Sequence, residues 1–139
     1  VVIPADGNCQ FAAVCDQLYG STEKAAKLRY VTVLWLQKNA DQVFPEGSIK
    51  DFVAGQSWEE YLKKMARNGT WGDHITLTAM SQMLKATITV ISSLKDDNSV
   101  VTISPTDAGD VEGRTIILSH YEDYHYGSVR HIAANQMKV

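Results

Sequence analysis

The sequence predicts an α+β domain in which helices come first and strands follow. Up to Lys85, apolar residues recur at spacings of three and four between capping residues and glycines, a pattern typical of helices. After Lys85, short runs alternate and are rich in β-branched residues, a pattern typical of strands. This order favours a layered α+β domain over a doubly wound parallel sheet. With 139 residues, the chain is expected to form one domain with its own core.

The first two helices are expected on either side of a glycine. One covers residues 9–18, directly after the turn-forming run Asp6-Gly7-Asn8, and has Gly20 as its C-cap. The other follows a cap at Ser21-Thr22 and reaches about Lys38. Its apolar residues lie nearly all round the helix, which predicts that it is buried.

Two further helices and one short turn complete the first part. A short helix is expected over residues 48–53. Ser57 and Glu60 form a capping box for a helix that reaches about residue 67. The last helix follows Gly72-Asp73 and carries an apolar face.

Four strands are expected in the last third, over residues 87–91, 100–103, 115–118 and 125–129. The third is a continuous apolar run, which suits a central strand. Residues 107–113 are expected to form a loop.

Composition excludes several classes of protein. A formal net charge of −3 provides no basic face for nucleic acid, and no apolar run approaches the roughly 20 residues that cross a bilayer. Two cysteines form neither a disulfide framework nor a zinc site, and no His or Cys pair has ligand spacing, so we expect no metal and no cofactor. These features indicate a soluble protein of a reducing compartment, cytoplasmic or nuclear. Because the chain begins at Val1, we expect a domain excised from a longer protein.

Cys9 is the candidate nucleophile. A catalytic thiol needs its thiolate, which a helix N-terminus or a neighbouring imidazolium favours, and Cys9 begins the first helix. The backbone N–H groups of Gly7, Asn8 and Cys9 are positioned to hold an oxyanion. The base must be a histidine brought in by the fold. The candidates are His74, His120, His125 and His131. Cys15, among small apolar residues, is expected in the core.

Three blocks of the sequence resemble the ovarian-tumour (OTU) family of deubiquitinating cysteine proteases. They are Asp6-Gly7-Asn8-Cys9-Gln10-Phe11, the Trp-Gly block at residues 70–77, and His125-Tyr126-Gly127-Ser128-Val129-Arg130. The resemblance spans residues 6–130 and implies a papain-like, OTU-type fold, with a central mixed or mostly antiparallel sheet flanked by helices. It also implies a thiol hydrolase that cleaves ubiquitin, or a ubiquitin-like modifier, from lysines. The partners it implies are ubiquitin, polyubiquitin chains and ubiquitinated proteins, with no nucleic acid and no membrane.

The resemblance also implies roles for particular residues. Cys9 would attack the carbonyl after the C-terminal glycine of ubiquitin, and His125 would move the proton. Asp6 would shape the active-site loop and contribute to its charge balance or to the oxyanion site. Trp71 and Gly72 would line the cleft for the ubiquitin tail. Tyr126 belongs to an aromatic cluster that either packs the last strands or narrows this channel.

Gly127 departs from the family pattern. Many members carry Asp or Asn two residues after the histidine, where it orients the imidazole. Here the orienting group is Asp6, another residue such as Asp123, or absent. This departure motivates an alternative hypothesis, a ubiquitin-binding module that is catalytically weak or inactive. Which linkage between ubiquitins would be preferred is not readable from the sequence.

Overall fold

The structure is a computed structural model of the 139-residue chain, and it describes residues 6–41, 43–44, 47–53, 55–92, 100–105, 114–121 and 125–129. Helices dominate the first two thirds and strands the last third, as expected. The helical elements are α1 (Cys9–Tyr19), α2 (Ala25–Lys38), the 3-10 turn η1 (Ile49–Phe52), α3 (Trp58–Met65) and α4 (His74–Leu84). The strands are β1 (Val43–Phe44), β2 (Gly47–Ser48), β3 (Ala86–Ser92), β4 (Val100–Ile103), β5 (Arg114–Tyr121) and β6 (His125–Ser128).

The main sheet has four strands in the order β4-β3-β5-β6 and is mixed. β3 pairs with β4 in antiparallel fashion and with β5 in parallel fashion, and β5 pairs antiparallel with β6. β6 therefore forms the edge of the sheet, with His125 opposite Tyr121 and Ser128 opposite Leu118. β1 and β2 form a separate antiparallel pair, which was not among the strands predicted from the sequence.

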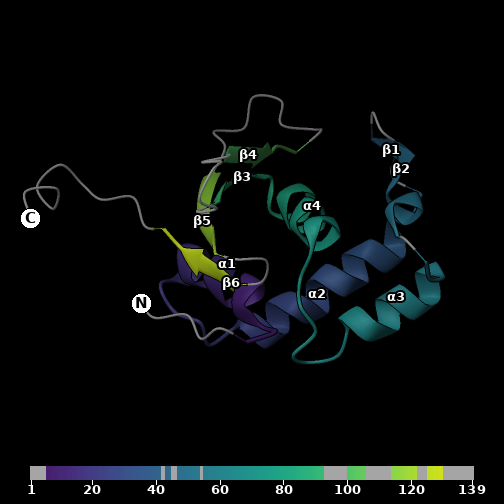
Figure 1. The fold of residues 1–139 in the computed structure, drawn as a ribbon, viewed down its shortest axis with the longest axis horizontal. Coiled ribbons are helices and arrows are strands. Elements are labelled where there is room, and N and C mark those ends of the chain that lie inside the picture. The colour runs from purple at the N-terminus through teal and green to yellow at the C-terminus, as the bar shows by residue number, and fades with distance from the viewer. Residues whose placement is uncertain are drawn as a thin grey trace, which may run out of the picture.

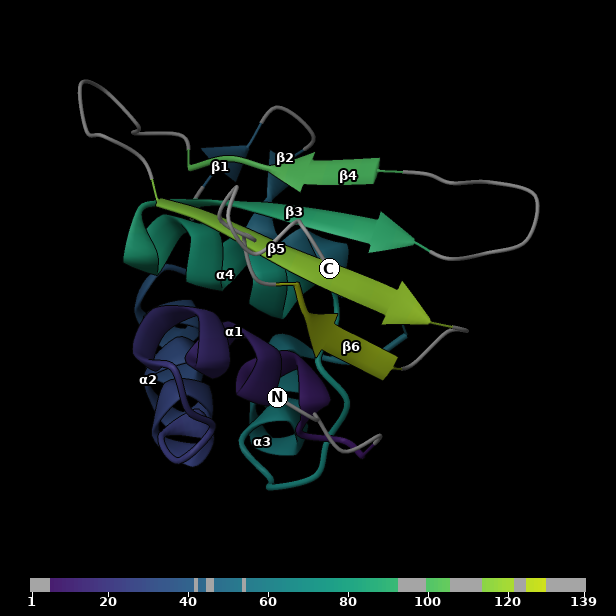
Figure 2. The ribbon, with the colours of Figure 1, turned by 90° about the vertical axis from the view of Figure 1, so that its left-hand side faces the viewer.

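The sheet and the helices form layers. α4 packs against β3, and α1 packs against β5 and β6, so both helices lie against the sheet. α2 packs on α1 and α4, and α3 packs on α2, on the side away from the sheet (Figure 1). Figure 2 shows the same arrangement from another side, with α1 directly beneath β6. The first helix and the last described strand therefore lie side by side.

α1 confirms its prediction closely. It begins at Cys9 and is followed by Gly20 in the left-handed conformation (φ 75°), whose N–H donates to the carbonyl of Asp16. Eight consecutive residues from Cys9 to Asp16 are buried, because α1 lies between the sheet and α2. A helix surrounded in this way has little freedom to shift, and this holds Cys9 in place.

The prediction for α2 was wrong in two respects. Its N-cap is Lys24, without a side-chain hydrogen bond, rather than Ser21 or Thr22. It is also buried on one face only, since Tyr30 is 63% exposed. The buried face contains the charged Arg29 and the polar Thr32 beside Leu28 and Leu36, so the apolar residues of the sequence did not by themselves define the buried surface of α2.

The caps of α3 and α4 follow from their sequences. Ser57 Oγ accepts a hydrogen bond from the N–H of Glu60 (3.1 Å), which is the Ser57 half of the predicted capping box. Asp73 caps α4 in a reciprocal capping box with Thr76. This cap fixes the start of α4 directly after Trp71 and Gly72. The predicted loop at residues 107–113 lies outside the described residues.

Candidate active site

Cys9 lies where the first helix meets the last described strand. It is the first residue of α1 and is 1% exposed. The backbone N–H of Tyr126 donates a hydrogen bond to Cys9 Sγ, with a distance of 3.2 Å. That N–H belongs to the peptide joining His125 to Tyr126, so residues 117 positions apart in sequence meet at the sulfur. The side chain of His125 lies outside the described residues.

The electrostatics of Cys9 differ from the expectation of a lowered thiol pKa. Burial raises the pKa of Cys9 above the ordinary cysteine value, and the Asp6 carboxylate raises it further. The backbone N–H groups of Tyr126 and Gln10 act in the opposite direction, because they donate to the sulfur. Position at a helix N-terminus therefore does not outweigh burial here. A thiol in this setting needs a base to take its proton near neutral pH.

The predicted oxyanion loop is folded around Asp6. The N–H of Asn8 donates to Asp6 Oδ1 (2.9 Å), and the N–H of Cys9 donates to the Asp6 carbonyl (3.1 Å). Asp6 itself is exposed. An oxyanion at this loop would compete with Asp6 for both N–H groups.

The Trp-Gly block lies against the same loop. Gln10, the residue after Cys9, donates from Nε2 to the Asp73 carbonyl (3.1 Å). A side chain at Gly72 would collide with Gln10, which explains the glycine. Trp71 is 40% exposed. The structure thus brings Trp71 and Gly72 beside the start of α1, and Gln10 is a contact that motif matching had not singled out.

Tyr61 supports this block from α3. Its hydroxyl donates to both carboxylate oxygens of Asp73 (2.8 and 2.9 Å). Burial, and then the Asp73 carboxylate, raise the pKa of Tyr61. The phenol therefore remains a hydrogen-bond donor, and it holds the cap of α4 in position.

The aromatic ring of Tyr126 is packed rather than displayed. The residue is 8% exposed, and its ring stacks on His120 with centroids 4.3 Å apart. Tyr126 also lines a small cavity of about 130 Å³ together with His74, Leu77 and His120. The ring of Tyr126 therefore packs the last strands, and Cys9 is not among the described residues that line this cavity.

The side chain of Ser119 limits the space at Gly127, two residues after His125. Gly127 pairs with Ser119 of β5, and a side chain at Gly127 would meet Ser119 Oγ at 2.6 Å. A larger residue at Gly127 would therefore require the Ser119 hydroxyl to move. Asp123, considered as an orienting group for His125, lies outside the described residues, as does His131.

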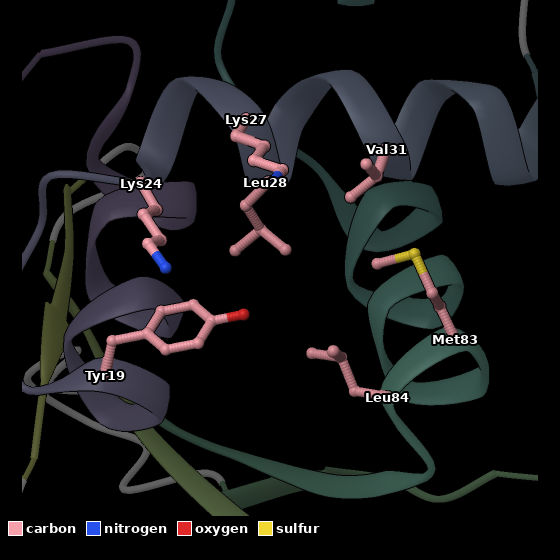
Figure 3. A pocket seen from close by; sticks show the side chains of 7 residues that line it. All are labelled: Tyr19, Lys24, Lys27, Leu28, Val31, Met83 and Leu84. Carbon is pink, nitrogen blue, oxygen red and sulfur yellow. The ribbon is translucent and has the colours of Figure 1, made fainter.

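The rest of the described chain contains a sizeable pocket away from Cys9. No group of three or more His, Cys, Asp or Glu side chains among the described residues is arranged to hold a metal, and no described helix could cross a membrane. A pocket of about 300 Å³ lies between the C-terminal ends of α1 and α4 and the start of α2 (Figure 3). No described residue of the predicted site contributes to it. Its lining residues are Tyr19, Lys24, Lys27, Leu28, Val31, Met83 and Leu84.

Comparison with known proteins agrees with this geometry. The family model described as "OTU-like cysteine protease" matches residues 4–131. The chain belongs to this family. The OTU match contains all three blocks on which the resemblance was based, and that prediction is confirmed.

Individual OTU proteins show the same relationship. The chain is 36% identical over 129 residues to "OVARIAN TUMOR DOMAIN-containing deubiquitinating enzyme 10" of Arabidopsis thaliana, covering 93% of this chain and 33% of that protein. The chain thus spans about a third of this relative's length. The solved OTUD1 OTU domain superposes with a TM-score of 0.78 at 26% identity, over 94% of this chain and 84% of that one. The Hazara virus OTU, solved bound to ubiquitin, has a TM-score of 0.72 at 22% identity, over 96% and 81%. The predicted α+β, OTU-type fold is confirmed.

Proposed function

We propose that this chain is a thiol-dependent deubiquitinase. It would hydrolyse isopeptide bonds after the C-terminal glycine of ubiquitin or a ubiquitin-like modifier. The observation that carries the proposal is the meeting of Cys9, at the start of α1, with the His125–Tyr126 peptide of β6. Membership of the OTU family, and relatives named as deubiquitinating enzymes, support the choice of substrate. The partners are ubiquitin, polyubiquitin chains and ubiquitinated proteins.

The acylation step uses Cys9 and His125. His125 takes the thiol proton, and Cys9 Sγ attacks the carbonyl carbon of the C-terminal glycine. The raised pKa of Cys9 makes this base necessary, because few thiols would ionise unaided at neutral pH. The tetrahedral intermediate then collapses, the carbon–nitrogen bond breaks, and the proton on His125 passes to the departing lysine amine. A thioester to Cys9 remains.

Water completes the cycle. His125 takes a proton from water, whose oxygen attacks the thioester carbon. The carbon–sulfur bond breaks, and the proton on His125 passes to Cys9 Sγ and restores the thiol. Ubiquitin leaves with a C-terminal carboxylic acid, which ionises to the carboxylate. In both steps the backbone N–H groups of Gly7, Asn8 and Cys9 donate to the oxyanion. For this, the N–H groups of Asn8 and Cys9 exchange their hydrogen bonds to Asp6 for bonds to the oxyanion. Trp71, Gly72 and Tyr126 line the path of the ubiquitin tail.

A ubiquitin derivative with a C-terminal electrophile tests this proposal directly. We expect one covalent adduct on the wild-type protein and on Cys15→Ala, and none on Cys9→Ala. Cys15 is a matched control, because it lies in the same helix and is 0% exposed. An adduct on Cys9→Ala, or none on the wild type, would refute Cys9 as the nucleophile.

A second candidate is a ubiquitin-binding module with little or no turnover. It is motivated by Gly127 and by Ser119, which fills the space where an orienting side chain would stand. Calorimetry with ubiquitin and a hydrolysis assay on linkage-defined di-ubiquitins separate the two candidates. Binding without hydrolysis of any chain would select the binding module.

A further inference from the structure

Arg29 is a buried cation in the middle of α2. Arg29 is 3% exposed. Among the described residues, the ion pair is between Lys50 and Asp41 and does not include Arg29. A buried charge is costly unless hydrogen bonds replace its hydration. Arg29 obtains these bonds from neutral oxygens in the segments around Cys9, so its position and those segments depend on each other.

The guanidinium of Arg29 joins α2 to three segments of the chain. Nη1 donates to the carbonyl of Met65 (2.8 Å), the last residue of α3. Nη2 lies within hydrogen-bond distance of the Thr70 carbonyl (2.7 Å) and the Gly7 carbonyl (3.0 Å). It also donates to Asn8 Oδ1 (2.8 Å), so two of its contacts are in the loop that precedes Cys9.

The two loops that Arg29 joins also contact each other. Asn8 Oδ1 accepts a second hydrogen bond, from the N–H of Gly69 (2.9 Å). Gly7 packs so tightly against the Gly69 carbonyl that no side chain could be added there. Residues 6–8 and residues 69–70 therefore form one unit, and the Arg29 guanidinium contacts both segments.

A second tie lies on the other side of Trp71. Gln10 donates to the Asp73 carbonyl, and Tyr61 holds the Asp73 carboxylate. The segment with Trp71 and Gly72 is thus anchored at Thr70 by Arg29 and at Asp73 by Gln10. The ring of Phe11 lies under the guanidinium, with Cζ 4.4 Å from its centroid, and prevents Arg29 from tilting.

We propose that Arg29 is the positioning residue of this active site. Its guanidinium holds residues 6–8 against residues 69–70, which sets where Cys9 lies relative to β6 and how Trp71 is presented. The effect on ubiquitin hydrolysis rests on the proposed function, whereas the positioning of Cys9 does not. Lysine cannot substitute, because one ammonium cannot match the planar set of donors that reaches Met65, Thr70 and the 6–8 loop.

The test compares Arg29→Met and Arg29→Lys with a control on the same helix face. Thr32→Val is that control, because Thr32 is 0% exposed and its hydroxyl donates only within α2, to the Leu28 carbonyl (2.7 Å). Two quantities are measured on each folded protein. One is the rate of iodoacetamide alkylation at Cys9 and at Cys15, resolved by tandem mass spectrometry. The other is kcat and KM for di-ubiquitin hydrolysis.

We expect Arg29→Met to uncover Cys9 selectively. Alkylation of Cys9 should accelerate about 10-fold while Cys15 stays as protected as in the wild type, and kcat/KM should fall by roughly 10–100-fold through misplacement of the reacting groups. Arg29→Lys should remain closer to Arg29→Met than to the wild type in the logarithm of both the Cys9 alkylation rate and kcat/KM. Thr32→Val should leave both quantities within about twofold of the wild type. Unchanged Cys9 protection in Arg29→Met, or equal acceleration of Cys9 and Cys15, would overturn the proposal.

A second variant keeps the test decisive if Arg29→Met does not fold. Asn8→Ala removes the shared acceptor of Arg29 and Gly69, in a residue that is only partly buried. It should also expose Cys9 while Cys15 stays protected, and failure to do so would count against the proposal. If the wild type hydrolyses no di-ubiquitin, the proposed function fails, while the alkylation rates still decide the role of Arg29.

Discussion

The two ends of α1 both contact β6, but they do so with different chemistry. At the first turn, the thiol of Cys9 accepts from the Tyr126 N–H, a weak bond to a reactive atom. Near the last turn, Ser128 Oγ donates to Asp16 (2.7 Å) and accepts from Gln17 Nε2 (2.8 Å), and Gln17 also donates to the Val129 carbonyl (2.7 Å). The C-terminal half of α1 thus fixes β6, and the N-terminal turn carries the proposed nucleophile.

The two cysteines of α1 can be compared in the same way, because Cys9 lies in its first turn and Cys15 in its second half. Both are buried, at 1% and 0% exposure, and burial raises the pKa of both thiols. Only Cys9 adjoins the loop of Asp6, the contacts of Arg29 and the His125–Tyr126 peptide. A buried thiol with a raised pKa is therefore not by itself a nucleophile; the loop and strand around it make the difference.

Replacing each cysteine tests this comparison with the largest expected effect. Cys9→Ala should lower di-ubiquitin hydrolysis by at least about 10⁴-fold, because no nucleophile remains. Cys15→Ala should keep activity within about twofold and cost about 1 kcal/mol of unfolding free energy through lost packing. Rates and urea denaturation measure both effects. A large loss of activity in folded Cys15→Ala would erase the distinction between the two thiols.

The glycines that flank α1 test the loop in the same way. Gly7→Ala should cost about 3 kcal/mol, because its methyl would collide with the Gly69 backbone, which cannot rotate away. Gly20→Ala should cost only about 1 kcal/mol, since its φ of 75° is strained for alanine but the space around it is open. Chemical denaturation of both variants gives the ranking. Equal costs would mean that the contact between residues 7 and 69 is not tight in solution.

Ser128 tests the anchoring end. Ser128→Ala should lower the unfolding free energy by about 1–2 kcal/mol, because Asp16 is 3% exposed and loses this donor. Ser119→Ala, in the neighbouring strand, is the matched control and should change stability by less than half as much. Thermal and urea unfolding of the pair measure the difference. If the control costs as much as Ser128→Ala, the bond to Asp16 does not fix β6.

Asp6 tests the reacting end without disturbing the loop. Asp6→Asn keeps an Oδ1 acceptor for the Asn8 N–H while removing the charge that raises the pKa of Cys9. The variant should alkylate Cys9 only about two- to threefold faster near neutral pH, because Asp6 is exposed and its charge is screened by solvent. Cys15 should not respond. A slower reaction at Cys9 would show that Asp6 supports the thiolate rather than opposing it.

The sequence predicted the elements that carry the motifs better than it predicted what holds them together. α1, its C-cap Gly20 and the Asp73 cap are local, and the turn and capping chemistry of a few neighbouring residues determines them. The three blocks also identified Cys9, Trp71 and Gly72 as neighbours. Hydrogen bonds across long sequence separations were not predictable in this way.

Arg29 and Gln10 show why. Arg29 is a charged residue of α2, and a charge usually indicates a solvent-exposed position, while its acceptors are 21 to 41 residues away. Gln10 follows the nucleophile, but its partner at Asp73 is 63 residues further on. Which polar residue faces the core depends on how α2, α3 and the loops pack. Burial was likewise the reason that the pKa of Cys9 moved opposite to expectation.

The comparison of the two thiols extends to a pH dependence of stability that they share. Because burial raises both pKa values in the folded state, the unfolded chain releases these protons at lower pH than the folded chain does. Their contribution to stability is therefore complete below the ordinary thiol pKa, about 8.5, and is lost as pH rises from there toward the folded values. Urea unfolding at pH 7 and pH 9.5 should show a decrease in the wild type of at most about 1.4 kcal/mol for each thiol, because pH 9.5 lies only about one unit above the unfolded thiol pKa. Cys9→Ala and Cys15→Ala should each make this decrease in unfolding free energy smaller.

If neither variant makes the decrease smaller, the pH dependence comes from other groups. The buried phenols of Tyr61 and Tyr126 are such groups, because burial also raises their pKa values.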